Sequence, residues 1–177
     1  VNSEYKFKKD DKLTILLEDV DKTYFTNEPI EILFEDDDYV VVLKPTGLLV
    51  HGDSNEIDTL ADRVGNHYKT LGYTHPVLPV HRIDKETSGM IVFAKHFISL
   101  ANLSHLFELN EVDKVYTAIV ENELDRKQGT LKANLKRDIH SNKIILSKSG
   151  KEAITHYKVI GIKDGRTLLD IKIDTGR

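Results

Sequence analysis

The sequence of 177 residues contains no cysteine and no tryptophan, and it has only four prolines. Without cysteine the protein cannot form a disulfide, a thiolate zinc site, an iron–sulfur cluster or a cysteine nucleophile. The longest apolar runs are short stretches such as 39–43, far below the roughly 18 to 20 residues of a membrane-spanning helix. We therefore expect no membrane partner, and the missing cysteine fits a reducing compartment such as the cytoplasm.

The remaining composition is that of a folded globular chain, with 40% hydrophobic and 31% charged residues. The formal charge is −4, from 25 basic and 29 acidic residues, but the charges are segregated. Residues 1–50 carry 6 Lys+Arg against 12 Asp+Glu, whereas residues 121–177 carry 13 against 8. The basic end could contact a polyanion, although a lysine-rich strand face is more often only a solvated surface.

Two β-branched runs at 30–34 and 39–43, joined by the acidic residues 35–38, predict a β-hairpin. The three consecutive aspartates in this turn could hold a magnesium ion, but we favour a solvated turn. The sequence Lys-Pro-Thr-Gly at 44–47 then ends the second strand in a tight turn.

Apolar residues spaced three and four apart predict a helix over 56–68, with Ser54 or Asn55 as its cap, and a second helix over 98–110. Pro76 and Pro79 lie in an extended approach to His81. Further strands are predicted at 90–94, 115–120, 144–146, 154–160 and 168–173. Strands follow one another too closely for repeated helical crossovers, so we predict a mixed α+β fold with a predominantly antiparallel sheet and flanking helices.

The most informative segment is His-Arg-Ile-Asp-Lys-Glu-Thr-Ser-Gly at 81–89, a polar loop between two apolar extended runs. Charged side chains on a loop with rigid ends are the usual arrangement of a reactive site. From chemistry alone a structural turn is the stronger alternative, in which Asp84 bonds nearby backbone amides.

This segment, continued by Met-Ile-Val-Phe-Ala-Lys, resembles the signature of the RluA-type RNA pseudouridine synthases, with Ile83 in place of the usual leucine. Further segments resemble the family in order and spacing over about residues 30–177. They are 35–51, the strand 114–120 with its tyrosine, the strand 150–160, and 169–177, which is similar to the approach to a third motif.

The resemblance implies isomerisation of a chosen uridine in RNA, without metal, redox change or nucleotide cofactor. Asp84 matches the catalytic aspartate, which acts as a nucleophile or as a base that removes a ribose proton. Arg82 matches the arginine that helps to extrude the target nucleotide, and Tyr116 the active-site tyrosine that stacks on the uracil.

Other loop residues have supporting roles in this interpretation. Thr87, Ser88 and Gly89 are expected to shape the turn that holds Asp84, and Lys44 could reach a phosphate. His81 is expected to orient the loop or bond the backbone, with RNA contact as the second possibility. The remaining histidines show no metal-ligand spacing, so no metal site is predicted.

The resemblance also suggests a chain cut at both ends, because the first residue is Val and the third motif normally continues beyond Thr-Gly-Arg. We expect residues 1–28 to be the tail of a small RNA-binding module with its linker, and 29–177 to be an incomplete catalytic domain. We expect a monomer that acts on ribosomal RNA ahead of transfer RNA.

Two alternatives from other classes stay open. A non-catalytic RNA-binding domain could keep the same fold. An unrelated glycoside hydrolase would need a second carboxylate about 5 to 10 Å from the first, and Glu86 is the only nearby acid in the sequence.

Overall fold

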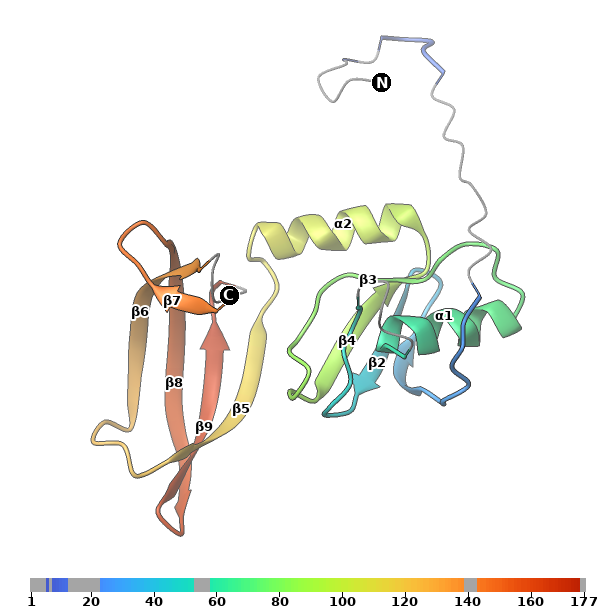
Figure 1. Cartoon of the computed structure of the whole chain (residues 1–177). Coiled ribbons are helices and arrows are strands. Elements are labelled where there is room, and N and C mark those ends of the chain that lie inside the picture. Colours follow the sequence, from blue (N-terminus) through green and yellow to red (C-terminus); the bar gives the residue numbers. More distant parts are fainter. Residues whose placement is uncertain (1–5, 7, 13–22, 53–57, 139–142, 176–177) are drawn as a thin grey trace. The chain divides into compact units, whose positions relative to one another are not determined.

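The computed structural model describes residues 6, 8–12, 23–52, 58–138 and 143–175, and it divides the chain into two compact units, 1–101 and 102–177 (Figure 1). In chain order the elements of the described residues are β1 (Glu31–Glu35), β2 (Tyr39–Lys44), α1 (Leu60–Thr70), β3 (Leu78–Pro79), β4 (Gly89–Ala94), α2 (Phe97–Glu108), β5 (Lys114–Glu121), β6 (Gln128–Arg137), β7 (Ile144–Leu146), β8 (Lys151–Lys163) and β9 (Arg166–Ile173). Neither described helix is long and apolar enough to cross a membrane.

The first unit is built on a four-stranded antiparallel sheet in the order β1-β2-β4-β3. The predicted hairpin of β1 and β2 is confirmed. Its turn is stabilised by Asp36, whose Oδ1 accepts hydrogen bonds from the amides of Asp38 at 2.9 Å and Tyr39 at 2.7 Å. Asp36 therefore stabilises the turn through its side chain, as aspartate commonly does in turns.

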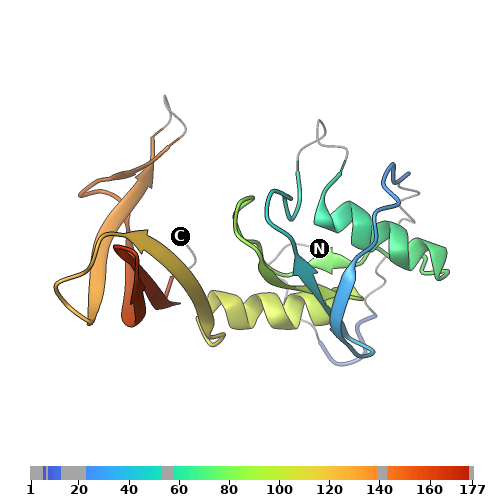
Figure 2. The same ribbon diagram turned by 90° about the horizontal axis from the view of Figure 1, so that it is seen from below.

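The core of this unit lies on one face of the sheet, where α1 packs (Figure 2). Side chains alternate along β2 and β4, so that Val40, Val42, Ile91 and Phe93 are all buried. Helix α1 contributes Leu60, Val64 and Tyr68, which are spaced four apart and lie on one side of a helix. The apolar periodicity of the sequence thus explains which face of each element is buried.

The helix begins later than the sequence predicted. Ser54 and Asn55, the expected caps, lie outside the described residues, and the cap is Thr59. The amide of Asp62 donates to Thr59 Oγ1 at 3.2 Å, while Asp62 Oδ2 accepts from the Thr59 amide at 3.2 Å and from its hydroxyl at 2.7 Å. This reciprocal capping box satisfies backbone donors that the first helical turn leaves unpaired.

The second unit contains a five-stranded antiparallel sheet in the order β5-β9-β8-β6-β7 (Figure 1). The strands predicted at 115–120, 144–146, 154–160 and 168–173 fall within β5, β7, β8 and β9. Strand β8 is longer than predicted at both ends, and its register with β9 is irregular between Val159 and Gly161. The sequence pattern did not predict the bounds of β6, because exposed and half-buried residues do not alternate regularly along this strand.

The predicted mixed α+β class is confirmed, with two separate antiparallel sheets in place of the single sheet that we expected. The second predicted helix corresponds to α2, within which the boundary between the two units falls after Ala101. The division predicted at residues 28 and 29 stays a prediction.

Candidate active site

The polar loop 81–88 joins β3 to β4 in the first unit. Its first end is held by β4, because the Val80 amide donates to the Val92 carbonyl at 2.9 Å and the Val92 amide donates to Nε2 of His81 at 3.2 Å, and its second end continues directly into β4. The Thr87 amide donates to the Asp84 carbonyl at 3.1 Å and closes the turn. His81 therefore contacts the backbone in this structure. The backbone of Asp84 is held by the hydrogen bond that its carbonyl accepts from Thr87.

The side chains of residues 82–84 lie alternately outside and inside the protein. Ile83 is only 9% exposed, whereas Arg82 and Asp84 on either side of it are exposed. Burial of the isoleucine anchors the loop and leaves both charged groups accessible from the solvent. A guanidinium and a carboxylate two residues apart are thus exposed on a held loop.

A second loop braces this one. The Lys85 carbonyl accepts hydrogen bonds from the Gly47 amide and from Nζ of Lys44, both at 2.9 Å, and the Glu86 carbonyl accepts from Oγ1 of Thr46 at 2.8 Å. All three donors come from the Lys-Pro-Thr-Gly turn at 44–47. The sequence showed this turn only as the end of a strand, and its contact with the loop required the tertiary structure.

Lys44 is placed differently from the prediction. Its side chain is completely buried, and besides the Lys85 carbonyl its Nζ donates to the carbonyls of Pro45 at 2.9 Å and Leu48 at 2.6 Å. Each of its three N–H donors is therefore on a backbone carbonyl, so the ammonium supports the loop and does not reach out to a phosphate.

The position of Lys44 also affects its protonation. Burial lowers the pKa of the Lys44 ammonium, and the carboxylates of Glu86 and Asp84 act in the opposite direction without cancelling the effect. The loop that carries Asp84 thus also interacts electrostatically with the Lys44 side chain beneath it.

Glycine is required where β4 begins. Gly89 has φ +151°, a backbone conformation that other residues rarely adopt, and Cδ1 of Ile83 lies 3.7 Å from where a Cβ would be. Thr87 is half-buried and Ser88 is exposed. Of the three residues expected to shape the turn, two make a contribution that the structure describes. Thr87 contributes through its amide, and Gly89 contributes through its backbone conformation.

Tyr116 lies on β5 in the second unit and is described with that unit. It is half-buried and faces the same side of the sheet as Ile171, Tyr157 and Gly129, which follow it in register across β9, β8 and β6. A Cβ at Gly129 would lie 2.8 Å from Cε1 of Tyr157, so this second tyrosine lies over the glycine. The more buried face of the sheet therefore carries two tyrosines.

One supporting network was not anticipated from the sequence. Oε1 of Glu35 accepts from Nζ of Lys95 at 2.8 Å and from the Tyr68 hydroxyl at 2.7 Å, and Lys95 also donates to the Asp36 carbonyl at 2.8 Å. These contacts tie the end of β1 to the residue after β4 and to α1. The available signal was the Ala-Lys that ends the motif, which places Lys95 directly after the strand.

The arrangement can carry out acid–base or nucleophilic chemistry with a carboxylate on a rigid loop. Over the described part of the chain, no group of three or more histidine, aspartate or glutamate side chains is placed to hold a metal ion.

Comparison with known proteins identifies the family. The model for RNA pseudouridylate synthase matches residues 38–177. An "Uncharacterized RNA pseudouridine synthase YhcT" of Bacillus subtilis is 36% identical over 176 residues, covering 96% of this chain and 58% of the relative. The "Ribosomal large subunit pseudouridine synthase D" of Nitrosomonas europaea is 36% identical over 151 residues, covering 84% of this chain and 44% of the relative.

Among solved structures, "Human RNA Pseudouridylate Synthase Domain Containing 4" matches with a TM-score of 0.69 and 27% identity, covering 83% of this chain and 60% of that one. The chain thus spans about half of the length of the curated relatives described above. The family model and both relatives are RNA pseudouridine synthases, as the resemblance of the sequence implied, and the chain therefore belongs to the RluA-type RNA pseudouridine synthases.

Proposed function

We propose that this protein isomerises specific uridines in RNA to pseudouridine, with Asp84 as the catalytic carboxylate. The observation that carries the proposal is the exposed Asp84 on a loop held by β4 and braced by the turn at 44–47. Membership of the family supports the same chemistry.

The reaction rearranges bonds without changing the composition of the substrate. The bond between N1 of uracil and C1′ of ribose breaks, the base turns, and a bond forms between C5 and C1′, while C5 loses a proton and N1 gains one. Asp84 would serve either as the nucleophile at C1′ or as the base that removes a ribose proton, and both roles need an ionised, accessible carboxylate.

Arg82 and Tyr116 have complementary roles in this proposal. Extruding a nucleotide from stacked RNA costs a few kcal/mol, which contacts with the protein must offset. The exposed guanidinium of Arg82, two residues from Asp84, would brace the RNA where the base has left. Tyr116 would stack on the extruded uracil, a contact of roughly 1 to 3 kcal/mol.

Ribosomal RNA is the substrate that we favour, because the Nitrosomonas europaea relative is named for the large ribosomal subunit. Mass-spectrometric mapping of pseudouridine in cells that lack the gene would identify the position through the site that disappears.

The proposal is tested by tritium release from RNA labelled at C5 of uracil. Asp84→Asn should abolish release by the full-length protein while leaving its thermal unfolding unchanged. Glu86→Gln, a matched change two residues along the same loop, should retain most of the activity. Release that survives Asp84→Asn would refute the assignment of the catalytic residue.

The same assay separates catalysis from the non-catalytic alternative. An RNA-binding domain with this fold would bind RNA in a gel-shift experiment and release no tritium at any protein concentration. A glycoside hydrolase acting through Asp84 and Glu86 would lose its activity with either substitution.

A further inference from the structure

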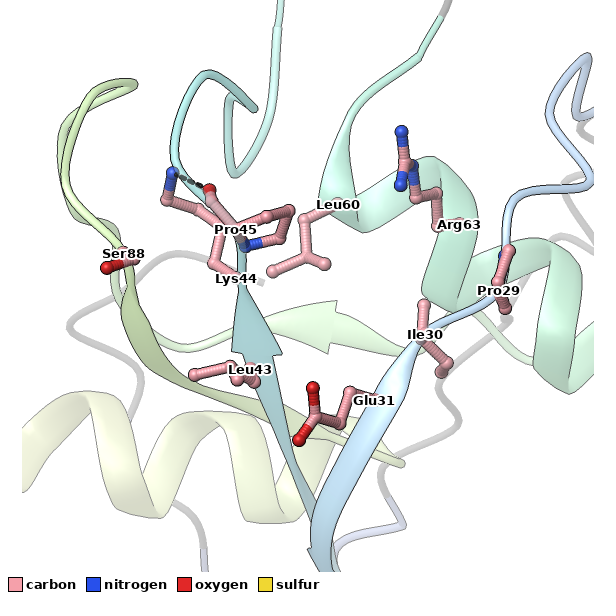
Figure 3. A pocket seen from close by; sticks show the side chains of 9 residues that line it. All are labelled: Pro29, Ile30, Glu31, Leu43, Lys44, Pro45, Leu60, Arg63 and Ser88. Carbon is pink, nitrogen blue, oxygen red and sulfur yellow. Dashed lines mark hydrogen bonds between the residues drawn. The ribbon is translucent and has the colours of Figure 1, made fainter.

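A pocket of about 410 Å³ lies beside the braced loop, within the roughly 300 to 1,000 Å³ of small-molecule sites (Figure 3). It opens where the chain enters β1 and leaves β2, and the first turn of α1 closes one side. Its lining residues are Pro29, Ile30, Glu31, Leu43, Lys44, Pro45, Leu60, Arg63 and Ser88. Lys44 and Pro45 belong to the bracing turn, and Ser88 belongs to the loop that carries Asp84.

The walls of the pocket are mainly apolar, since five of these residues are prolines, leucines or isoleucine. Arg63 is held by its two hydrogen bonds to Asp58, from Nε at 2.9 Å and from Nη2 at 2.6 Å. In contrast, neither the Glu31 carboxylate nor the Ser88 hydroxyl has a hydrogen bond or ion pair with another residue that the structure describes. The pocket thus combines flat apolar surface with a hydrogen-bond acceptor that has no protein partner there.

We propose that this pocket binds an unstacked nucleobase that carries an exocyclic amino group, from a nucleotide flanking the target uridine. The inference rests on the proposed function, because RNA that presents a uridine to Asp84 passes the Ser88 end of the same loop. Enzymes that act on an extruded base commonly choose their substrates through pockets for the neighbouring nucleotides. Unstacked bases of RNA are recognised by side-chain surfaces on their faces and by hydrogen bonds on their edges.

The Glu31 carboxylate decides which base is favoured. An ionised carboxylate only accepts hydrogen bonds, and it pairs with the amino group of cytosine or adenine. Uracil presents its O4 carbonyl oxygen where cytosine has the amino group, and this oxygen repels a carboxylate. The pocket should therefore prefer cytosine or adenine to uracil.

The test is a methyl-group NMR titration of the full chain with cytidine 5′-monophosphate and with uridine 5′-monophosphate, each up to about 10 mM, ten times a millimolar dissociation constant. Cytidine monophosphate should shift the methyl signals of Ile30, Leu43 and Leu60. Those of Ile91, in the buried core, and of Leu169, in the second unit, should stay in place. Uridine monophosphate should bind about tenfold more weakly, the size expected for one hydrogen bond to a charged group.

Glu31→Gln should abolish the preference, because a carboxamide both donates and accepts hydrogen bonds. Glu28→Gln is the matched control, since it removes the same charge nearby at a residue that does not line the pocket. The inference is overturned if the three pocket methyls do not shift, if the two nucleotides bind equally, or if the two substitutions have the same effect.

Failure of this inference can be distinguished from failure of the proposed function. Asp84→Asn should leave the cytidine monophosphate shifts unchanged while abolishing tritium release. Tritium release by a protein whose pocket methyls do not respond would refute the pocket assignment alone.

Discussion

Lys44 is the residue on which the geometry of the Asp84 loop depends most directly. A buried ammonium is costly unless every donor is satisfied, and here three carbonyls from two loops satisfy it. The charge also lies beneath the carboxylates of Asp84 and Glu86 and attracts both. Lys44 therefore joins the two loops mechanically and places an ammonium group beneath the loop that carries Asp84.

Lys44→Met keeps a side chain of similar length but removes the ammonium donor from the carbonyls of Pro45 and Leu48, while the Lys85 carbonyl keeps only the Gly47 amide. We expect the free energy of unfolding to fall by about 3 kcal/mol, since each unsatisfied buried polar group costs roughly 1 to 3 kcal/mol and relaxation recovers part of this. Urea denaturation measures the change. Lys85→Met is the matched control, because that side chain is exposed and only its carbonyl takes part in the brace. Equal losses in the two variants would contradict the role given to Lys44.

At the scale of elements, two sets of hydrogen bonds position α1, one at its own start and one between the helix and the ends of β1 and β4. The capping box of Thr59 and Asp62 sets where the helix begins, and the Glu35 network joins the far ends of the two strands to Tyr68. Because Leu60 and Arg63 line the pocket, the start of α1 also determines the shape of the proposed base site.

Thr59→Ala should lower the free energy of unfolding by about 1 to 2 kcal/mol, because the Asp62 amide and carboxylate each lose the hydrogen bond to the threonine hydroxyl. Thr59→Ser keeps the hydroxyl and should cost less than about 0.5 kcal/mol. Chemical denaturation of both variants tests this. A similar loss in the serine variant would show that the threonine methyl group, and not the hydrogen bond, matters.

The Glu35 network should make stability depend on acid. The hydrogen bond from Lys95, and next that from Tyr68, hold the pKa of the Glu35 carboxyl below its usual 4.5. The folded protein then binds this proton less readily than the unfolded chain does. The stabilisation is therefore fully present above pH 4.5 and is lost as the pH falls through the lower folded value.

Glu35→Gln should flatten the dependence of the urea midpoint on pH below 4.5 and lower the midpoint at neutral pH. Glu111→Gln, at an exposed carboxyl on another part of the chain, should leave the pH profile as it is in the wild type. An unchanged slope in Glu35→Gln would mean that other groups dominate the acid response.

At the scale of the whole molecule, the segregated charge follows the division into units. The second unit contains residues 121–177, with 13 basic and 8 acidic residues, whereas residues 1–50 of the first unit carry 6 and 12. Lys132 on β6 and Lys158 on β8 are exposed on the same face of the five-stranded sheet. A polyanion such as RNA would be attracted chiefly to this unit.

Lys132→Ala and Lys158→Ala should each weaken the binding of a labelled RNA hairpin and reduce the slope of log K against log salt by about 0.7 to 0.9. Fluorescence anisotropy at several salt concentrations measures this slope. Lys69→Ala, a surface lysine at the end of α1 in the first unit, should leave the slope nearly unchanged. If the Lys69 variant changes the slope as much as the other two do, the attraction does not depend on the second unit.

Much of the fold and of the site could be predicted because the signals are local. The hairpin of β1 and β2 follows from two β-branched runs around an acidic turn. The alternation of side chains along β2 indicates which of them are buried. The loop at 81–89 was recognisable from its order of residues alone, including the glycine whose positive φ begins β4. Such patterns can be recognised without the tertiary structure because they depend on residues that are close together in the sequence.

The features that were missed depend on residues far apart in the chain. Lys44 looked like a phosphate ligand because a lysine after a strand is usually exposed, and only the packing of the loop at 85–86 against it buries the ammonium. The start of α1 at Thr59 was misplaced because several polar residues before the helix could each have been its cap. The Glu35 network joins residues 33 and 60 positions apart, which no periodicity reveals.

The sequence by itself determined the family, the mixed α+β class and the loop that carries Asp84, because order and spacing along the chain are sufficient for each of these. Only the tertiary structure decided that Lys44 braces this loop, that Arg82 and Asp84 are exposed around a buried Ile83, and that a pocket lies beside Ser88. The reason is physical: burial and hydrogen-bond satisfaction are properties of groups brought together in space.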